Sequence, residues 1–362
     1  MSTIEIRKVT KRFGDFVAVR DADLVVKAGE VVCLLGPSGC GKTTTLRMIA
    51  GLERATAGDV IIAGKRVNDL PPEKRDIAMV FQFYALYPAL TVGDNIAMPL
   101  HFEKLSKHAM DKRVMKVAEI LHLTEVLDRM PGQVSEGEKQ RIAVARAIVR
   151  DPSCFLFDEP LSRLDVELRH SMRGQIKEVL SGLSKATVIV THDQLEALTM
   201  ADRIAIMRDG LIEQVGTPHE VFAKPANVFV ASFIGTPQMN LVDADFASFA
   251  DGQAKVSMAG EGLTIAADPA VARLKPSKVK IGIRPRAFAT VSAASGYSIP
   301  AQAELIEPMG AETLIHARTR SGGDIRVVVP RNKRVKTGET LHLRPDPRQT
   351  HFFGQDGKAV RT

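Results

Sequence analysis

The sequence predicts an α/β domain with a mostly parallel sheet and a helical insertion, followed by a smaller all-β domain. Short β-branched runs alternate with longer segments of helical period over the first two thirds of the 362 residues. Helical period dominates between about residues 88 and 150. Beyond residue 235, short alternating runs are separated by Gly, Pro and Asp, as in a small β-barrel. We therefore expect domains over residues 1–235 and 236–362.

Continuous apolar runs mark the strands of the first domain, because parallel strands are buried on both faces. In the second domain the strands alternate between apolar and polar residues, which is typical of a sheet with one solvated face. The predicted strands are 31–36, 77–81, 153–159 and 187–192 in the first domain, and 279–285, 311–319, 324–330 and 339–345 in the second.

Composition excludes several classes of protein. The chain has no low-complexity tract and no run near the ~18 to 20 apolar residues that span a bilayer. Its N-terminus enters a strand-like alternation without the apolar core of a signal peptide. Cys33, Cys40 and Cys154 lack the spacing of metal ligands. We expect a cytoplasmic chain without disulfides that reaches a membrane only through partners.

The net charge of +7 is unevenly distributed. Residues 1–235 carry 31 basic and 30 acidic side chains, a balance of +1, whereas residues 236–362 carry 18 and 12, a balance of +6. A small basic domain leaves nucleic-acid binding open. A solvated surface is the simpler interpretation of a cluster such as 331–336.

The segment "GPSGCGKTT" matches the phosphate-binding G-x-x-x-x-G-K-[ST] pattern, with an apolar strand before it and a helix after it. Its glycines let the backbone curl so that successive N–H groups point at phosphates. We expect Lys42 to reach the β- and γ-phosphates of ATP and the Thr43 hydroxyl to ligate Mg²⁺. The expected nucleotide-binding residues of this loop are Gly36, Pro37, Ser38, Gly39, Cys40, Gly41, Lys42, Thr43 and Thr44.

The segment "CFLFDEP" supplies carboxylates at the end of a predicted strand. Asp158 is placed beside the phosphate loop, where we expect it to hold the magnesium shell. Glu159 extends past the strand end and is the candidate base that polarises the attacking water.

A second helix start with affinity for phosphate follows in "VSEGEKQRIAVARA". Ser135 and Gly137 precede an apolar-periodic helix, and free N–H groups at a helix start favour anions. One chain therefore carries two such helix starts, about a hundred residues apart.

With these motifs in this order, the chain resembles the ATPase subunit of an ABC transporter, in the maltose-type group of carbohydrate importers, over nearly its whole length. "KRFGD" is similar to the adenine-stacking segment, with Phe13 as the stacking ring. "IAMVFQFYALYP" is similar to the Q-loop, which implies that Gln82 lies near Mg²⁺ and the attacking water. "LSRLD" resembles the D-loop, with Asp165, and "VTHDQLEAL" resembles the switch region, with His192 at the γ-phosphate. The resemblance thus implies a catalytic set of Lys42, Gln82, Glu159 and His192.

In this family two ATPase chains pack head to tail, and ATP lies between the phosphate loop of one and the signature helix of the other. Ser135 and Gly137 would then contact ATP bound by the partner chain. The resemblance also implies two integral membrane permease subunits, which grip the helical insertion and the aromatic segment after Gln82. It further implies an extracytoplasmic solute-binding protein that acts through the permease subunits. The chain itself is implied to lie peripherally on the cytoplasmic face of the inner membrane. The second domain is implied to serve dimerisation and regulator docking.

The signature departs from the usual Leu-Ser-Gly-Gly-Gln, because Glu136 stands at the first glycine. Two unit charges ~7 Å apart at an effective dielectric of ~20 repel by roughly 2 kcal/mol. Lys139, Arg141 or a solvent-facing rotamer could reduce that repulsion. Glu136 is therefore either a tolerated variant or one that weakens the ATP site to which this signature contributes in the partner chain. A homodimer and a heterodimer with a second, non-identical ATPase both stay open.

Two other functions stay open. An ATP-driven clamp could act on nucleic acid through the basic second domain, since OB-like barrels can bind oligonucleotides. No nucleic acid is expected, however, because the aromatic residues of this domain are scattered. Only Phe352 and Phe353 are adjacent there, so the domain lacks an evident platform on which bases could stack. An importer ATPase could also serve another cargo than a sugar, polyol, glycerol or glycerol phosphate, such as a polyamine or an inorganic anion.

Overall fold

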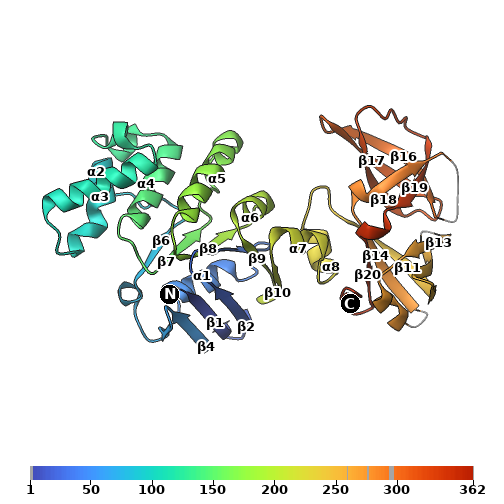
Figure 1. Cartoon of the computed structure of the whole chain (residues 1–362), viewed down its shortest axis with the longest axis horizontal. Helices are drawn as coiled ribbons and strands as arrows, with labels where there is room; N and C mark the ends of the chain where they lie inside the picture. The colour runs from blue at the N-terminus through green and yellow to red at the C-terminus, as the bar shows by residue number, and fades with distance from the viewer. Residues whose placement is uncertain (1–2, 259, 275–276, 293–296, 362) are drawn as a thin grey trace. The chain divides into compact units, whose positions relative to one another are not determined.

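The computed structural model describes residues 3–258, 260–274, 277–292 and 297–361. The chain folds as two compact units, Met1–Pro218 and His219–Thr362, which are described separately (Figure 1).

A six-stranded sheet forms the centre of the first unit. Five neighbouring strands run parallel, and β10 closes one edge antiparallel to β9. Every residue of β3, β7 and β8 is buried, as expected for strands covered on both faces. The four strands predicted for this domain are therefore confirmed. In spatial order the sheet consists of β10 (Leu211–Gly216), β9 (Arg203–Arg208), β3 (Val31–Leu35), β8 (Ala186–Thr191), β7 (Cys154–Asp158) and β6 (Ile77–Val80).

A second, antiparallel sheet packs against the six-stranded sheet, and the sequence analysis did not predict its strands. Its apolar side chains share one core with α1 (Lys42–Ala50) and with β3, β7, β8 and β9. Leu46 and Ile49 of α1 are fully buried there, and the helix after the phosphate loop packs on β7 and β8 of the central sheet and on β2 of the antiparallel sheet. The sheet consists of β2 (Phe16–Val26), β1 (Ile4–Phe13), β4 (Ala57–Ile62) and β5 (Lys65–Arg66).

Helices occupy the segment between β6 and β7, where the sequence predicts helical structure. They are α2 (Val92–Ala97), α3 (Lys107–Ile120) and α4 (Glu136–Ile148), joined by 3-10 turns at Met98–Phe102, Thr124–Val126 and Pro131–Gln133. Helix α4 packs on α2, α3 and β6. After β7 and β8 follow α5 (Val166–Ser181) and α6 (Gln194–Met200), which pack on each other.

The second unit is built from two five-stranded antiparallel sheets around a shared apolar core. Strands β14, β17, β18 and β19 confirm the four strands predicted for this domain. One sheet is β13 (Glu261–Ala266), β12 (Gln253–Met258), β11 (Asn240–Ala250), β14 (Ser277–Ile283) and β20 (Thr350–Phe353); the other is β15 (Phe288–Val291), β19 (Thr340–Pro345), β16 (Ile299–Pro308), β17 (Glu312–Thr319) and β18 (Asp324–Pro330).

Helices α7 (Pro218–Ala223) and α8 (Val228–Phe233) fold with this second unit, although the sequence prediction assigns them to the first domain. The buried Arg284 holds them, because its guanidinium donates to the carbonyls of Ile234, at 2.8 Å, and Phe222, at 2.6 Å. It also lies 3.6 Å from the centre of the Phe222 ring. A composition change near residue 235 cannot show this attachment, since it depends on a side chain fifty residues away.

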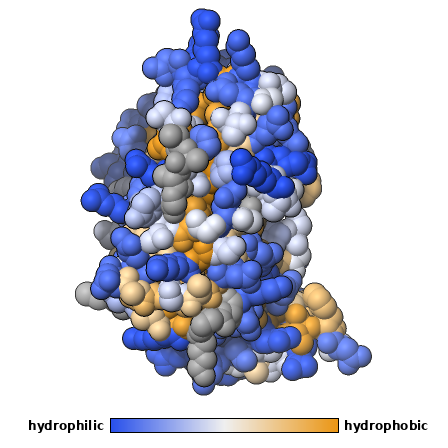
Figure 2. Space-filling model, turned by 90° about the vertical axis from the view of Figure 1, so that its right-hand side faces the viewer, coloured by the Kyte–Doolittle hydropathy of each residue, from blue (hydrophilic) through white to orange (hydrophobic). Residues whose placement is uncertain are grey.

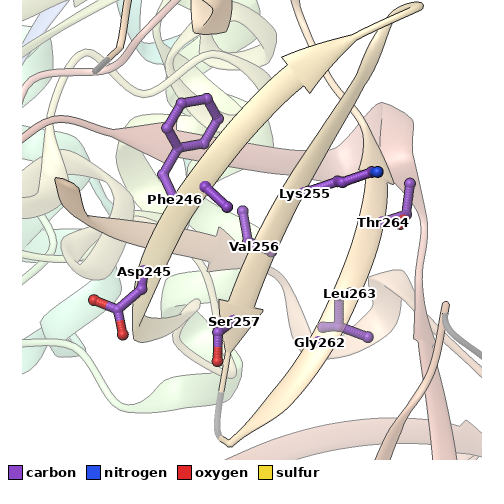
Figure 3. Close-up of a pocket in the computed structure, with 9 residues that line it drawn as sticks. Asp245, Phe246, Lys255, Val256, Ser257, Gly262, Leu263 and Thr264 are labelled. Carbon is purple, nitrogen blue, oxygen red and sulfur yellow. The ribbon is translucent and has the colours of Figure 1, made fainter. Parts of the chain in front are cut away.

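The surface of the second unit contains a shallow hollow of about 370 Å³ over β11, β12 and β13 (Figure 3). Lys255 pairs with Thr264 and Ser257 with Gly262 across these strands, and these four residues are among those that line the hollow. None of the predicted site residues lines it. On the face shown in Figure 2, apolar side chains form narrow patches bordered by polar ones.

Replacing Arg284 with Ala should lower the free energy of unfolding of the full chain by about 2 to 4 kcal/mol, because two buried carbonyls lose a charged donor. Urea titration followed by circular dichroism measures this. Arg286→Ala is the matched control, since the ion pair of Arg286 with Glu312 is exposed and should contribute little. Equal effects of the two substitutions would contradict the anchoring role of Arg284.

Candidate nucleotide site

The phosphate loop connects β3 to α1 and depends on two glycines with no room for a side chain. A Cβ on Gly36 would lie 2.3 Å from the Met207 carbonyl oxygen, and one on Gly41 would lie 2.5 Å from that of Ala18. Gly41 also has φ = 102°, a conformation that only glycine adopts readily. The Lys42 ammonium donates to the carbonyls of Gly36, at 2.8 Å, and Pro37, at 2.9 Å. The loop thus curls around a buried cation at a helix start, which is an anion-binding arrangement.

The remaining residues of the loop differ in what they offer a ligand. Pro37, Ser38 and Gly39 are exposed, and Thr44 is half-buried in the first turn of α1. Cys40 is buried, and burial raises the pKa of its thiol although Lys42 lies nearby. Cys40 therefore fills the space beneath the loop as a packing residue.

Thr43 and Asp158 form an oxygen pair beside the loop, with the Thr43 hydroxyl 3.2 Å from the Asp158 carboxylate. Burial raises the pKa of Asp158, and the hydrogen bond from Thr43 opposes that shift. A hard divalent cation at this carboxylate would stabilise its charged form and offset the cost of its burial, so these residues fit Mg²⁺. Within the described part of the chain no group of three His, Cys, Asp or Glu side chains could hold a metal.

Three predicted catalytic residues meet at the carboxyl edge of the central sheet. One carboxylate oxygen of Glu159 lies 3.1 Å from Nδ1 of His192, and the other accepts the Gln82 amide N–H at 3.1 Å. They follow β6, β7 and β8, whose parallel order brings their carboxyl ends together. Glu159 adopts φ = 48°, a left-handed conformation that is strained for a non-glycine residue. The sequence predicts these residues separately, and the structure joins them in one network.

The predicted adenine-stacking residue lies at the tip of the hairpin between β1 and β2. Phe13 is 48 % exposed and pairs across the hairpin with Phe16, which is 63 % exposed. The Lys11 ammonium lies 4.6 Å from the centre of the Phe13 ring. The prediction that adenine stacks on Phe13 stays a prediction. The sequence analysis missed Phe16, although its spacing across a Gly-Asp turn is a hairpin signal.

The signature segment begins α4 with a capping box that the sequence analysis also missed. The backbone N–H of Glu138 donates to the Ser135 hydroxyl, and both the backbone N–H and the hydroxyl of Ser135 donate to the Glu138 carboxylate at 2.7 Å. The S-x-x-E spacing is its sequence signal. Gly137 is buried, and a Cβ there would lie 2.9 Å from Leu168.

Glu136, the departure from the family pattern, forms an ion pair of 2.7 Å with Lys139. This pairing lowers the pKa of the Glu136 carboxyl, whose side chain is 53 % exposed. The charge at the first signature position is therefore balanced on its own helix, one of the ways in which repulsion of a triphosphate could be reduced.

The two helix starts lie on different elements of the unit. Helix α1 packs on β7 and β8, whereas α4 packs on α2, α3 and β6. Asp165, the predicted D-loop residue, caps α5 by accepting the Leu168 N–H at 2.8 Å. The contact of Ser135, Gly137 and Asp165 with nucleotide stays a prediction.

Comparison with known proteins agrees with this geometry. The ABC transporter family matches residues 19–162, and the TOBE domain family matches residues 274–353. The trehalose/maltose import ATP-binding protein MalK of Thermococcus litoralis is 45 % identical over 99 % of this chain and 100 % of its own length. The sn-glycerol-3-phosphate import ATP-binding protein UgpC of Bordetella avium is 43 % identical, covering 100 % and 99 %. The alpha-glucoside transport ATP-binding protein AglK of Rhizobium meliloti is 43 % identical over the whole of both chains.

Among solved structures, the dimeric ATP-binding cassette MJ0796 bound to ADP and Pi aligns with a TM-score of 0.53 and 32 % identity, covering 59 % of this chain and 98 % of its own. Along the described residues of our chain, no helix has the length and apolar character needed to cross a membrane.

Replacing Gly36 with Ala should weaken nucleotide binding by about tenfold or more, because the new Cβ collides with a backbone carbonyl and the loop must open. Gly39→Ala is the matched control within the same loop. At Gly39 a Cβ meets nothing within 4 Å, so only the cost of φ = 79° applies, about 1 kcal/mol. Titration with a fluorescent ATP analogue measures both, and similar affinities for the two variants would contradict the steric argument.

Proposed function

The chain belongs to the ABC transporter family as an ATP-binding subunit, and on that premise we propose that it hydrolyses ATP between two such subunits to drive solute import. One observation carries the proposal. The phosphate loop and the joined side chains of Gln82, Glu159 and His192 come from the carboxyl ends of neighbouring parallel strands. Loop, base and orienting groups therefore face one region, as phosphoryl transfer to water requires.

In this proposal each side chain has a distinct task. Glu159 accepts the proton of the attacking water, and Gln82 and His192 orient the Glu159 carboxylate and the transferred phosphoryl group. Lys42 balances the charge of the β- and γ-phosphates. Thr43 and Asp158 would hold Mg²⁺, with Gln82 nearby, and the cation would supply charge neutralisation at the phosphate oxygens.

The second helix start is proposed to act on the partner subunit. Since α4 and α1 pack on different elements, Ser135 and the backbone of Gly137 suit an ATP held by another chain. The dimeric state of the related cassette supports this arrangement. The ion pair of Glu136 with Lys139 supports the interpretation of Glu136 as a tolerated variant of the signature. We therefore propose a homodimer of this chain.

A groove of about 720 Å³ beside the Q-loop is the proposed docking site for an integral membrane permease subunit, so a dimer of two such chains would hold two permease subunits. It lies between β6, α4 and the turn after α2, and it is lined by apolar rings and by charges. Phe102, 85 % exposed, Phe81 and Tyr87 are among the rings, and Arg146 and Arg150 supply positive charge. Exposed aromatic side chains beside arginines are typical of protein interfaces. Docking there places the chain on the cytoplasmic face of the membrane.

The cargo is proposed from the relatives. Their names describe import of trehalose and maltose, sn-glycerol 3-phosphate and alpha-glucosides. We propose a sugar, polyol, glycerol or glycerol phosphate as the solute, delivered to the permeases by an extracytoplasmic solute-binding protein.

Sharing of the ATP site predicts complementation between two inactive variants. Lys42→Ala removes the cis charge, and Ser135→Glu places a negative charge toward the partner's phosphates, so each alone should lose hydrolysis about tenfold or more. An equimolar mixture forms some dimers in which one composite site is intact, and a phosphate-release assay should detect regained turnover. Absence of recovery, with mixed dimers shown by differential tagging, would contradict the head-to-tail arrangement.

The import function predicts co-purification of the chain with integral membrane proteins. A tagged Glu159→Gln variant, which should hydrolyse ATP slowly and stay in its nucleotide-bound state, should retain them better than wild type. Salt-dependent binding of the purified chain to DNA or RNA, without such membrane partners, would instead support the nucleic-acid clamp.

A further inference from the structure

Two loops leave the central sheet side by side after β6 and β7, because these strands are paired in parallel up to Val80 and Phe157. Gln82 of the first loop donates to Glu159 of the second, at 3.1 Å, and lies 3.5 Å from the Ser162 hydroxyl. The residues that follow Gln82 and Ser162 in the sequence also contact each other. The guanidinium of Arg163 lies 3.9 Å from the centre of the Phe83 ring.

The contact between Arg163 and Phe83 is well placed for a cation–π interaction. The Phe83 side chain is 62 % exposed, so no core packing holds it in place. A guanidinium stacked at this distance is attracted by the ring quadrupole. Arg163 also faces the start of α4, where it adds to the effect of Lys139 in keeping the pKa of Glu136 low.

The two residues that follow Phe83 are held by a different element. Arg146 of α4 donates to the carbonyls of Tyr84, at 2.8 Å, and Ala85, at 2.6 Å. Gln82, whose amide is proposed to be catalytic, and Phe83 join this loop to the loop after β7. The Gln82 amide itself is held by its hydrogen bond to Glu159, at 3.1 Å, and by a longer contact with the Ser162 hydroxyl, at 3.5 Å.

We propose that Arg163, acting through the Phe83 ring, is a positioning residue that holds Gln82 against Glu159 for ATP hydrolysis. The stack fixes the backbone next to Gln82 and so limits where its amide can lie. This inference rests on the proposed function, because it assigns Gln82 and Glu159 to the reacting groups.

Kinetics of the full chain provide the first test. Arg163→Ala and Phe83→Ala should each lower kcat for ATP hydrolysis about two- to fivefold, the effect of an exposed cation–π contact, with KM for ATP unchanged. The double variant should lose no more than either single variant, because both remove the same contact. Phe83→Trp, which keeps a ring, should retain wild-type kcat, and Arg66→Ala is the control for loss of an exposed arginine. Additive losses, or a kcat unchanged in Arg163→Ala, would overturn the proposal.

A spectroscopic test does not depend on hydrolysis. The chain has no tryptophan, so Phe83→Trp introduces a unique fluorophore at the stack. Adding Arg163→Ala to this variant should lower the tryptophan anisotropy and raise its quenching by acrylamide. Unchanged anisotropy would overturn the proposal. Absence of hydrolysis in the wild-type chain would refute the proposed function instead, while the anisotropy comparison would still decide whether Arg163 anchors the loop.

Discussion

The parallel pairing of β6, β7, β8 and β3 is the constraint on which the rest of the structure depends. Parallel neighbours end at one edge of the sheet, so the chain that leaves each strand enters the same region. The phosphate loop, Gln82, Glu159 and His192 all follow these strands directly. The buried sheet thus places the groups proposed to act on ATP within reach of one another.

Close backbone packing makes the phosphate loop specific. Two glycines lie so near to other carbonyls that any side chain would displace the strand or the loop. The amino group of Lys42 is enclosed by the carbonyl oxygens of the same loop, which compensates for its burial. The positive φ of Glu159 shows strain at the position proposed for the general base, where packing of the neighbouring strands maintains it.

Charge is balanced locally at the start of α4. Glu136 pairs with Lys139 within its own helix. Asp158 is buried beside Thr43, and burial raises the pKa of its carboxyl, so a cation bound there would stabilise its charged form. Arginines perform a different task, because their planar groups bind carbonyls and rings together. Arg146 and Arg284 each hold two backbone carbonyls, and Arg163 stacks on Phe83.

The sequence by itself determined the phosphate loop, the buried strands and the carboxylate pair after β7. These features are contiguous, and local backbone geometry and apolar periodicity specify them without knowledge of the fold. Only the tertiary structure decided that Gln82 and His192 hydrogen-bond to Glu159, across 77 and 33 residues of chain. It also decided that Arg284 attaches α7 and α8 to the second unit and that Arg163 stacks on Phe83. Contacts of this kind follow from strand order and from side-chain packing between distant segments, and neither leaves a periodic or local mark in the sequence.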